Sequence, residues 1–239
     1  MTASGYGAPD SVVLVMDTAT TRVVVALAAP DGRMCAVATW DAGYRHGETL
    51  LPTIVRILSD NGLDRSRLAG FVIGTGPGAF TGLRVGIATA KGLAHGLGRP
   101  LVGISTAEAL LAGASRLAAD PAVASAAGVP VLLLPAGPSD RIVVRPGSEP
   151  VLLPGGREPD LVPGEWLVAV DLDGRAPVEA LQRGAAARER LAEELAASGT
   201  ARLRDGRPDD PAGLVPEYVT LPRGITGERG EVAWSRDPR

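Results

Sequence analysis

A glycine-rich run in the first half of the chain, GTGPGAFTGLRVGIATAKGLA at residues 74–94, holds residue types that bind phosphate in other proteins. It contains six glycines and the only lysine of the chain, Lys91. A phosphate-binding P-loop needs lysine and then serine or threonine directly after its last glycine, but Gly82 is followed by leucine and arginine. A dinucleotide-binding loop needs a third glycine, where this chain has Thr81. The run therefore fits neither nucleotide motif.

Candidates for metal binding or nucleophilic chemistry are few. The two histidines, His46 and His95, are far apart in sequence, and the chain has no HExxH motif. The single cysteine, Cys35, lies in an apolar run, so we expect a buried side chain and not a nucleophile. These observations predict neither a metal ion nor a cofactor.

The composition is that of an ordinary globular protein. The chain has 239 residues, 45% hydrophobic and 21% charged, with a net charge of −3. That charge gives no general reason to bind nucleic acid or an anionic membrane. The N-terminus has no basic region leading into an apolar core, and no apolar run reaches the roughly 18 residues of a membrane span. We therefore expect a cytoplasmic protein.

The elements that would position the glycine-rich run follow a recognisable order. Apolar runs at residues 11–17 and 22–40 predict three strands, the last two joined by a Pro-Asp-Gly turn. Helical and strand periodicity then alternates at residues 47–62, 70–74, 80–97, 101–104 and 105–117. The order β-β-β-α-β-α-β-α predicts an α/β protein of the ribonuclease H-like or actin-like (ASKHA) fold.

The chain divides into three predicted parts. Residues 1–118 form an N-terminal actin-like subdomain. Residues 119–204 form a smaller, degenerate α/β subdomain, with strands near 129–134, 141–145 and 166–170 and one helix over 178–197. Residues 205–239, rich in Pro, Gly and charge, are predicted to be an extended tail.

The helix over residues 80–97 has three different faces. At about 100° per residue, an apolar face turns to the sheet and a narrow basic stripe carries Arg84, Lys91 and His95. The remaining face carries Gly82, Gly86, Thr89, Gly92 and Gly96. Each helical glycine costs up to about 1 kcal/mol relative to alanine. The glycines therefore indicate close approach of another helix, either within the chain or from a second protein.

Four segments of the sequence resemble the bacterial TsaB family, also called YeaZ. They are VLVMDTAT at 13–20, HGETLLPTIVRIL at 46–58, GTGPGAFTGLRVGIATAKGLAHGLGRPLVGISTAEAL at 74–110 and PEYVTLP at 216–222. The strong matches span about residues 13–111, and the second half matches only in length and element order. Where many family members have an Asp-Ala-Arg run, this chain reads LLLPAGPSDRIVV at 132–144.

The resemblance implies a non-catalytic subunit in the formation of N6-threonylcarbamoyladenosine beside the anticodon of tRNAs that read ANN codons. It implies a heterodimer with a TsaD-like paralogue, a TsaE-like ATPase in the same complex, and tRNA contacted indirectly through the complex. A homodimer of the isolated chain stays an alternative. The family's interface helices correspond to residues 46–61 and 80–97, so the residues expected at the partner interface are His46, Leu50, Ile54, Gly82, Arg84, Gly86, Thr89 and Lys91.

The same resemblance explains why no catalytic residue is predicted. TsaD paralogues carry two metal-binding histidines where this chain has Thr106 and Leu110, and neither side chain replaces imidazole as a ligand there. Actin-like ATPases have glycine where this chain has Ala19, whose Cβ would crowd a phosphate. Asp17 and Thr20 are candidates for a vestigial phosphate loop, although a turn-capping role is the favoured interpretation of Asp17.

Two enzyme hypotheses compete with the partner-subunit interpretation. One is a small ATPase or kinase-like enzyme of the same fold, and the other is a peptidase homologue. Nucleotide binding by the isolated chain would favour the first, and bound zinc or peptide turnover would favour the second.

Overall fold

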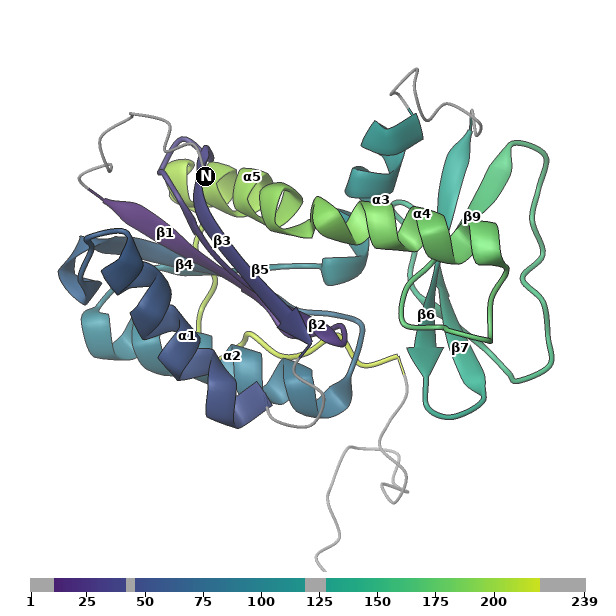
Figure 1. Cartoon of the computed structure of the whole chain (residues 1–239), viewed down its shortest axis with the longest axis horizontal. Coiled ribbons are helices and arrows are strands. Elements are labelled where there is room, and N and C mark those ends of the chain that lie inside the picture. Colours follow the sequence, from purple (N-terminus) through teal and green to yellow (C-terminus); the bar gives the residue numbers. More distant parts are fainter. Residues whose placement is uncertain (1–10, 42–45, 119–127, 220–239) are drawn as a thin grey trace, which may run out of the picture.

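The computed structural model describes residues 11–41, 46–118 and 128–219. Two β-sheets form two lobes, and helices lie between the sheets and on the outer face of the first sheet (Figure 1). Of the predicted tail, residues 205–219 are described and 220–239 lie outside the described residues, as do residues 119–127 at the start of the predicted second subdomain.

The first sheet has five strands in the order β3-β2-β1-β4-β5. β1 (Val12–Asp17), β2 (Arg22–Ala28) and β3 (Met34–Asp41) form an antiparallel meander. β4 (Leu68–Gly74) pairs parallel to β1, and β5 (Leu101–Ile104) pairs parallel to β4. This arrangement confirms the predicted ribonuclease H-like, actin-like order of elements.

β1 is buried on both faces, which is why its sequence is apolar throughout. Side chains alternate across a strand, so Val13 and Val15 join the core between the two lobes. Leu14 and Met16 join the core beneath the outer helices. The strand therefore carries the loop that follows Asp17 on a rigid support.

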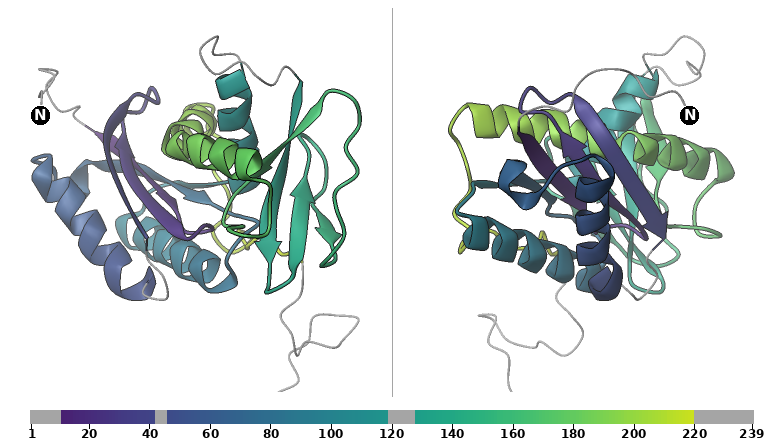
Figure 2. Two further views of the ribbon diagram at one scale, coloured as in Figure 1. Left: turned by 45° about the vertical axis from the view of Figure 1, so that its right-hand side comes forward. Right: turned by 60° about the vertical axis from the view of Figure 1, so that its left-hand side comes forward.

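Four helices cover the two faces of the first sheet. The outer face carries α1 (His46–Asp60) and α2 (Phe80–Leu97), which lie side by side (Figure 2). The inner face carries α5 (Leu191–Arg204), and α3 (Thr106–Ala118) packs between α5 and the second lobe. A short 3-10 helix, Arg65–Arg67, leads into β4.

The second sheet has the order β8-β7-β6-β9. Its strands are β6 (Val129–Ala136), β7 (Asp140–Val144), β8 (Val151–Leu153) and β9 (Glu165–Ala169). β6, β7 and β8 form an antiparallel meander, and β9 pairs parallel to β6, which repeats the topology of the first sheet with fewer elements. β8 has only three residues and was not predicted.

The single helix predicted over 178–197 is wrong, because the chain forms two helices there. α4 (Val178–Glu189) ends at Arg190, and α5 begins at the next residue. α4 packs on β9, whereas α5 packs on β4 and β5 of the first sheet. The break allows one continuous stretch of sequence to cover both lobes.

Candidate protein-docking surface

The loop after β1 is held by a buried carboxylate. Asp17 is fully buried; Ala19 N donates to its Oδ1 at 2.9 Å, and Thr106 Oγ1 donates to its Oδ2 at 2.6 Å. Burial raises the pKa of Asp17 from 3.8 to about 6, against the opposing effect of the Thr106 hydrogen bond. The bond from Ala19 confirms the turn-capping interpretation of Asp17.

The glycine-rich run closes this loop. Ala79 N donates to Ala19 O at 2.7 Å. A Cβ on Gly78 would lie 2.1 Å from that same oxygen. Thr18 Oγ1 donates to Gly82 O at 2.8 Å, and buried Thr20 donates to Arg22 O at 2.8 Å. The loop's polar groups are therefore satisfied by the chain itself.

A hollow of about 540 Å³ lies between the lobes, in front of the closed loop. Two of its charged residues are already engaged by the protein. Arg175 Nη1 donates to the carbonyls of Gly137 and Pro138 at 3.1 and 2.9 Å. Asp171 accepts from Thr21 and from Arg188. Nη1 of Arg175 and the carboxylate of Asp171 are therefore bonded within the chain.

On α1, the residues predicted at the interface are not the residues that the structure exposes. His46 begins the helix, and its side chain lies outside the described residues. Leu50 and Ile54 are 1% and 4% exposed, so their assignment to an exposed interface is wrong. Leu51 and Val55 are 49% and 66% exposed and turn outward instead.

On α2, two of the predicted glycines face inward. Gly82 and Gly86 are buried, and a Cβ on Gly86 would lie 2.1 Å from Thr18 Oγ1. Their assignment to a surface available to a second protein is therefore wrong. They allow α2 to approach the loop after β1, so the close neighbour of Gly86 is a loop residue of the same chain and not the helix that the sequence predicted.

The remaining predicted residues of α2 lie at its surface. Arg84 is exposed, and Thr89 and Lys91 are half-buried. Gly92 and Gly96 are exposed, and a Cβ on either would meet nothing within 4 Å. Since α1 and α2 lie side by side, their outward residues share one surface. We define the docking face as Leu51, Val55, Ala88, Gly92 and Gly96.

Sequence reasoning missed two kinds of residue at this surface. Leu51 and Val55 are four residues apart on a helix whose apolar positions exceed one face, and that excess is the signal that could have identified them. Tyr218 was missed because only folding brings it to Arg84, whose Nε donates to Tyr218 Oη at 3.0 Å.

Comparison with known proteins shows which proteins this chain resembles. The family model described as TsaD, tRNA N6-adenosine threonylcarbamoyltransferase, matches residues 40–131, which contain α1, α2 and α3. The Escherichia coli tRNA threonylcarbamoyladenosine biosynthesis protein TsaB is 33% identical over 114 residues, 44% of this chain and 44% of that protein. Over part of its length, the chain is similar to proteins named TsaB from three bacteria.

Two further matches differ in what they cover. An uncharacterised protein of Mycobacterium leprae is 42% identical over 104 residues, 42% of this chain and 29% of that protein. The chain therefore spans less than half the length of these curated relatives. The solved structure of YeaZ from Pseudomonas aeruginosa matches 87% of this chain and all of that one, at 23% identity and a TM-score of 0.65, which shows the shared fold.

None of the helices in the described ranges is both long and apolar enough to cross a membrane. No group of three or more His, Cys, Asp or Glu side chains is placed there to hold a metal ion.

Proposed function

We propose that this chain is a non-catalytic partner subunit of a TsaD-type protein, required for N6-threonylcarbamoyladenosine modification beside the anticodon of tRNAs that read ANN codons. In this proposal a TsaE-like ATPase joins the complex, and tRNA is contacted through the complex. The names of the relatives support this role, because they are described as tRNA threonylcarbamoyladenosine biosynthesis proteins.

The observation that carries the proposal is the docking face. Leu51 and Val55 expose apolar side chains on α1, while Gly92 and Gly96 leave the neighbouring surface of α2 without side chains. Large exposed apolar residues beside a flat strip suit the close packing of a helix from another protein. The five residues come from two helices that one sheet holds in place, so the face is preorganised.

The closed loop supports the non-catalytic part of the proposal. The position of a first metal-binding histidine in the enzymatic paralogues is taken by Thr106, whose hydroxyl donates to Asp17. The second is taken by Leu110, which is fully buried in the core. Ala19 places a Cβ where an actin-like ATPase needs glycine, and its carbonyl is bonded to Ala79 N.

The competing ATPase or kinase-like function draws on the hollow between the lobes. A nucleotide needs backbone N–H groups or cations aimed at its phosphates. Here Ala19 N bonds to the Asp17 carboxylate, and Arg175 bonds to backbone carbonyls. The partner-subunit function therefore accounts for more of the structure.

Co-expression with the TsaD-type protein of the same organism tests the proposal. We expect the two chains to co-purify at equal stoichiometry. We also expect the pair to restore threonylcarbamoyladenosine, measured by nucleoside mass spectrometry of bulk tRNA, in cells depleted of the native subunit. Failure of both assays with soluble proteins would reject the proposal.

The isolated chain needs a separate measurement, because the same face could join two copies of it. Light scattering coupled to gel filtration, with and without the TsaD-type protein, distinguishes the assemblies. We expect any homodimer to be replaced by the heterodimer. A homodimer that persists beside unbound TsaD-type protein would contradict the assignment of the docking face.

A further inference from the structure

The segment that follows α5 returns to the first lobe and is fixed there. Glu217 N donates to Thr75 O at 2.8 Å. The Glu217 carboxylate accepts from Thr75 Oγ1 and, at 3.0 Å, from Ser105 Oγ. Thr75 directly follows β4, and Ser105 directly follows β5. Residues 215–219, which we call the C-terminal strap, are therefore bound to the ends of two neighbouring parallel strands.

The strap ends against the first turns of α2. Tyr218 and Phe80 pack with ring centroids 5.3 Å apart and an interplanar angle of 36°. The guanidinium carbon of Arg84 lies 3.8 Å from the Phe80 ring centroid, within cation–π range. Arg84 Nε donates to Tyr218 Oη at 3.0 Å. Arg84 is thus held by one aromatic ring and one hydroxyl.

The rest of the guanidinium stays open. In the described part of the chain, no carboxylate forms an ion pair with Arg84, and its side chain is exposed. Arginine carries four further N–H donors on its two terminal nitrogens. These donors match a carboxylate in a bidentate arrangement.

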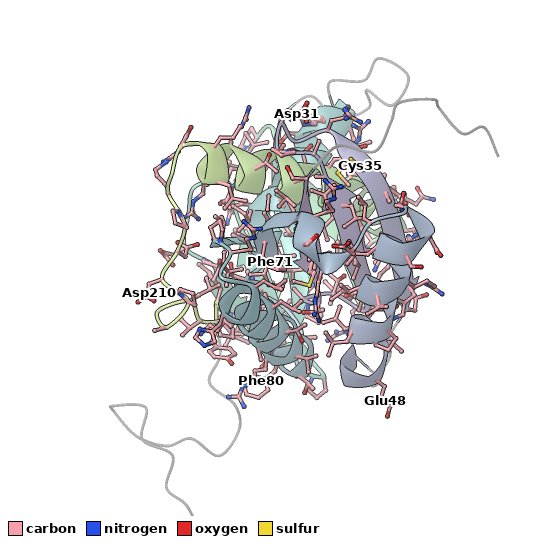
Figure 3. All side chains as sticks on the ribbon, turned by 90° about the vertical axis from the view of Figure 1, so that its left-hand side faces the viewer. Asp31, Cys35, Glu48, Phe71, Phe80 and Asp210 are labelled. Atoms are coloured by element: carbon pink, nitrogen blue, oxygen red, sulfur yellow. The ribbon has the colours of Figure 1, made fainter. Side chains whose placement is uncertain are left out.

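Arg84 also lies at the edge of the docking face. Residues four apart follow one side of a helix, so Arg84, Ala88 and Gly92 form a row along α2. In Figure 3 α2, marked by Phe80, lies between α1, marked by Glu48, and the C-terminal segment, marked by Asp210. The row therefore joins the docking face to the strap.

We infer that the C-terminal strap is part of the docking site, with Tyr218 positioning Arg84 so that its guanidinium receives a carboxylate of the docked TsaD-type partner. This inference rests on the proposed function. An arginine already held in place loses little conformational freedom on binding. A carboxylate at the rim of an apolar face also fixes the register of the partner helix.

A protein carboxylate suits this site better than an RNA phosphate. Phosphate backbones are bound by several spread cations. Here Arg84 shares its basic stripe on α2 only with Lys91 and His95, and a hollow of about 610 Å³ beside Tyr218 is lined by Glu108, Glu149 and Glu217. These carboxylates make the surface beside the strap unfavourable for a long polyanion.

Binding affinity for the purified TsaD-type partner, measured by titration calorimetry, tests the inference through a double-mutant cycle. Tyr218→Phe removes the hydroxyl and keeps the ring. We expect it to weaken binding about three- to tenfold. Arg84→Gln should weaken binding about ten- to a hundredfold and reduce the dependence of Kd on salt. The double variant should bind no more weakly than Arg84→Gln, because Tyr218 acts through Arg84.

Two controls separate positioning from folding. The thermal midpoint of Tyr218→Phe should stay within error of the unchanged protein. Glu149→Gln, which removes an exposed carboxylate outside the docking face and the strap, should bind normally. If the two substitutions weaken partner binding by factors that multiply in the double variant, Tyr218 does not act through Arg84 and the positioning role is overturned. Weaker binding of isolated tRNA by Arg84→Gln, with partner binding unchanged, would show a phosphate contact and overturn the inference.

The outcomes also distinguish this inference from the proposed function. Normal partner binding by Arg84→Gln, with binding lost in Leu51→Glu, would reject the inference and leave the docking face supported. No binding of the partner by the unchanged protein would reject the proposed function, and the inference with it.

Discussion

The hydroxyl of Thr106 donates a 2.6 Å hydrogen bond to the buried carboxylate of Asp17. The bond joins the last residue of β1 to the first residue of α3. A Cβ on Gly74 would lie 1.8 Å from Asp17 Oδ2, so the pair is enclosed by the end of β4 as well. Thr106, which stands where the resemblance implies a metal-binding histidine in TsaD paralogues, here supports the fold.

Because of Asp17, the free energy of unfolding should decrease as pH rises. Its pKa is raised to about 6 in the folded chain from 3.8, so between those values the folded state holds a proton that the unfolded state has lost. The free energy of unfolding should therefore decrease as pH rises from about 4 to 6, by about 3 kcal/mol at most, and change no further above that range. Urea denaturation at several pH values between 3.5 and 7, with about ten points per curve, measures this change in the free energy of unfolding.

Asp17→Asn should remove this dependence, since the variant cannot ionise at that position. The exposed Asp60→Asn provides the control for loss of one carboxyl elsewhere. The decisive quantity is the difference between the variant and unchanged curves. If that difference is constant across pH 4–6, Asp17 ionises normally in the folded protein.

Gly86→Leu and Gly92→Leu should have opposite effects on stability. A side chain on Gly86 would collide with Thr18, so we expect a loss of about 3 kcal/mol or more. Gly92 faces open space, and leucine there should add up to about 1 kcal/mol through helix propensity. Gly92→Leu should nevertheless lose the partner, because it fills the docking face.

Thermal denaturation and co-purification measure the two effects. Ser198→Leu serves as the matched control, because Ser198 is an exposed position on α5, across the first sheet from the docking face. It should fold and bind normally. Full partner binding by a stable Gly92→Leu protein would remove α2 from the proposed interface.

Leu51→Glu should separate binding from folding on α1. The side chain is 49% exposed, so stability should change by no more than about 0.5 kcal/mol. A charge at the centre of an apolar contact should weaken partner binding by about tenfold or more. Leu50→Glu, one residue earlier and fully buried, should instead unfold the chain, and circular dichroism distinguishes the two. A Leu51→Glu protein with unchanged affinity would contradict the assignment of α1.

The isolated chain should show no ATP hydrolysis above background. Ala19 N bonds to Asp17 and Ala19 O accepts from Ala79 N, so neither group faces a phosphate. Release of phosphate is measured on protein freed of the TsaD-type partner. Ala19→Gly provides the informative comparison, because Gly78 would still cover the loop and activity should stay absent. Turnover by the unchanged chain would favour the ATPase hypothesis.

Glu217→Ala should release the strap. It removes the acceptor of two hydroxyl hydrogen bonds, which we expect to cost about 1–3 kcal/mol. Limited proteolysis should then cut within residues 205–219 faster than in the unchanged chain. Glu149→Ala is the control at an exposed carboxyl. Equal cleavage rates in all three proteins would show that Glu217 does not hold the strap.

The sequence by itself determined the order of elements and the absence of nucleotide and zinc motifs. Period-two apolar runs such as residues 12–17 and 22–28 specify strands locally. The strand–helix alternation after a meander leaves few compact arrangements. The Asp17 cap was predictable for the same reason, since its bond to Ala19 spans two residues.

Only the tertiary structure decided which helix faces are free. α1 has more apolar residues than one face holds, so periodicity did not show that Leu50 turns inward and Leu51 outward. The glycines of α2 also differ in their surroundings. A side chain on Gly86 would contact Thr18, which follows β1, whereas a Cβ on Gly92 would have no atom within 4 Å. The contact of Tyr218 with Arg84 joins residues 134 positions apart. Such contacts depend on packing between elements, which local sequence patterns do not encode.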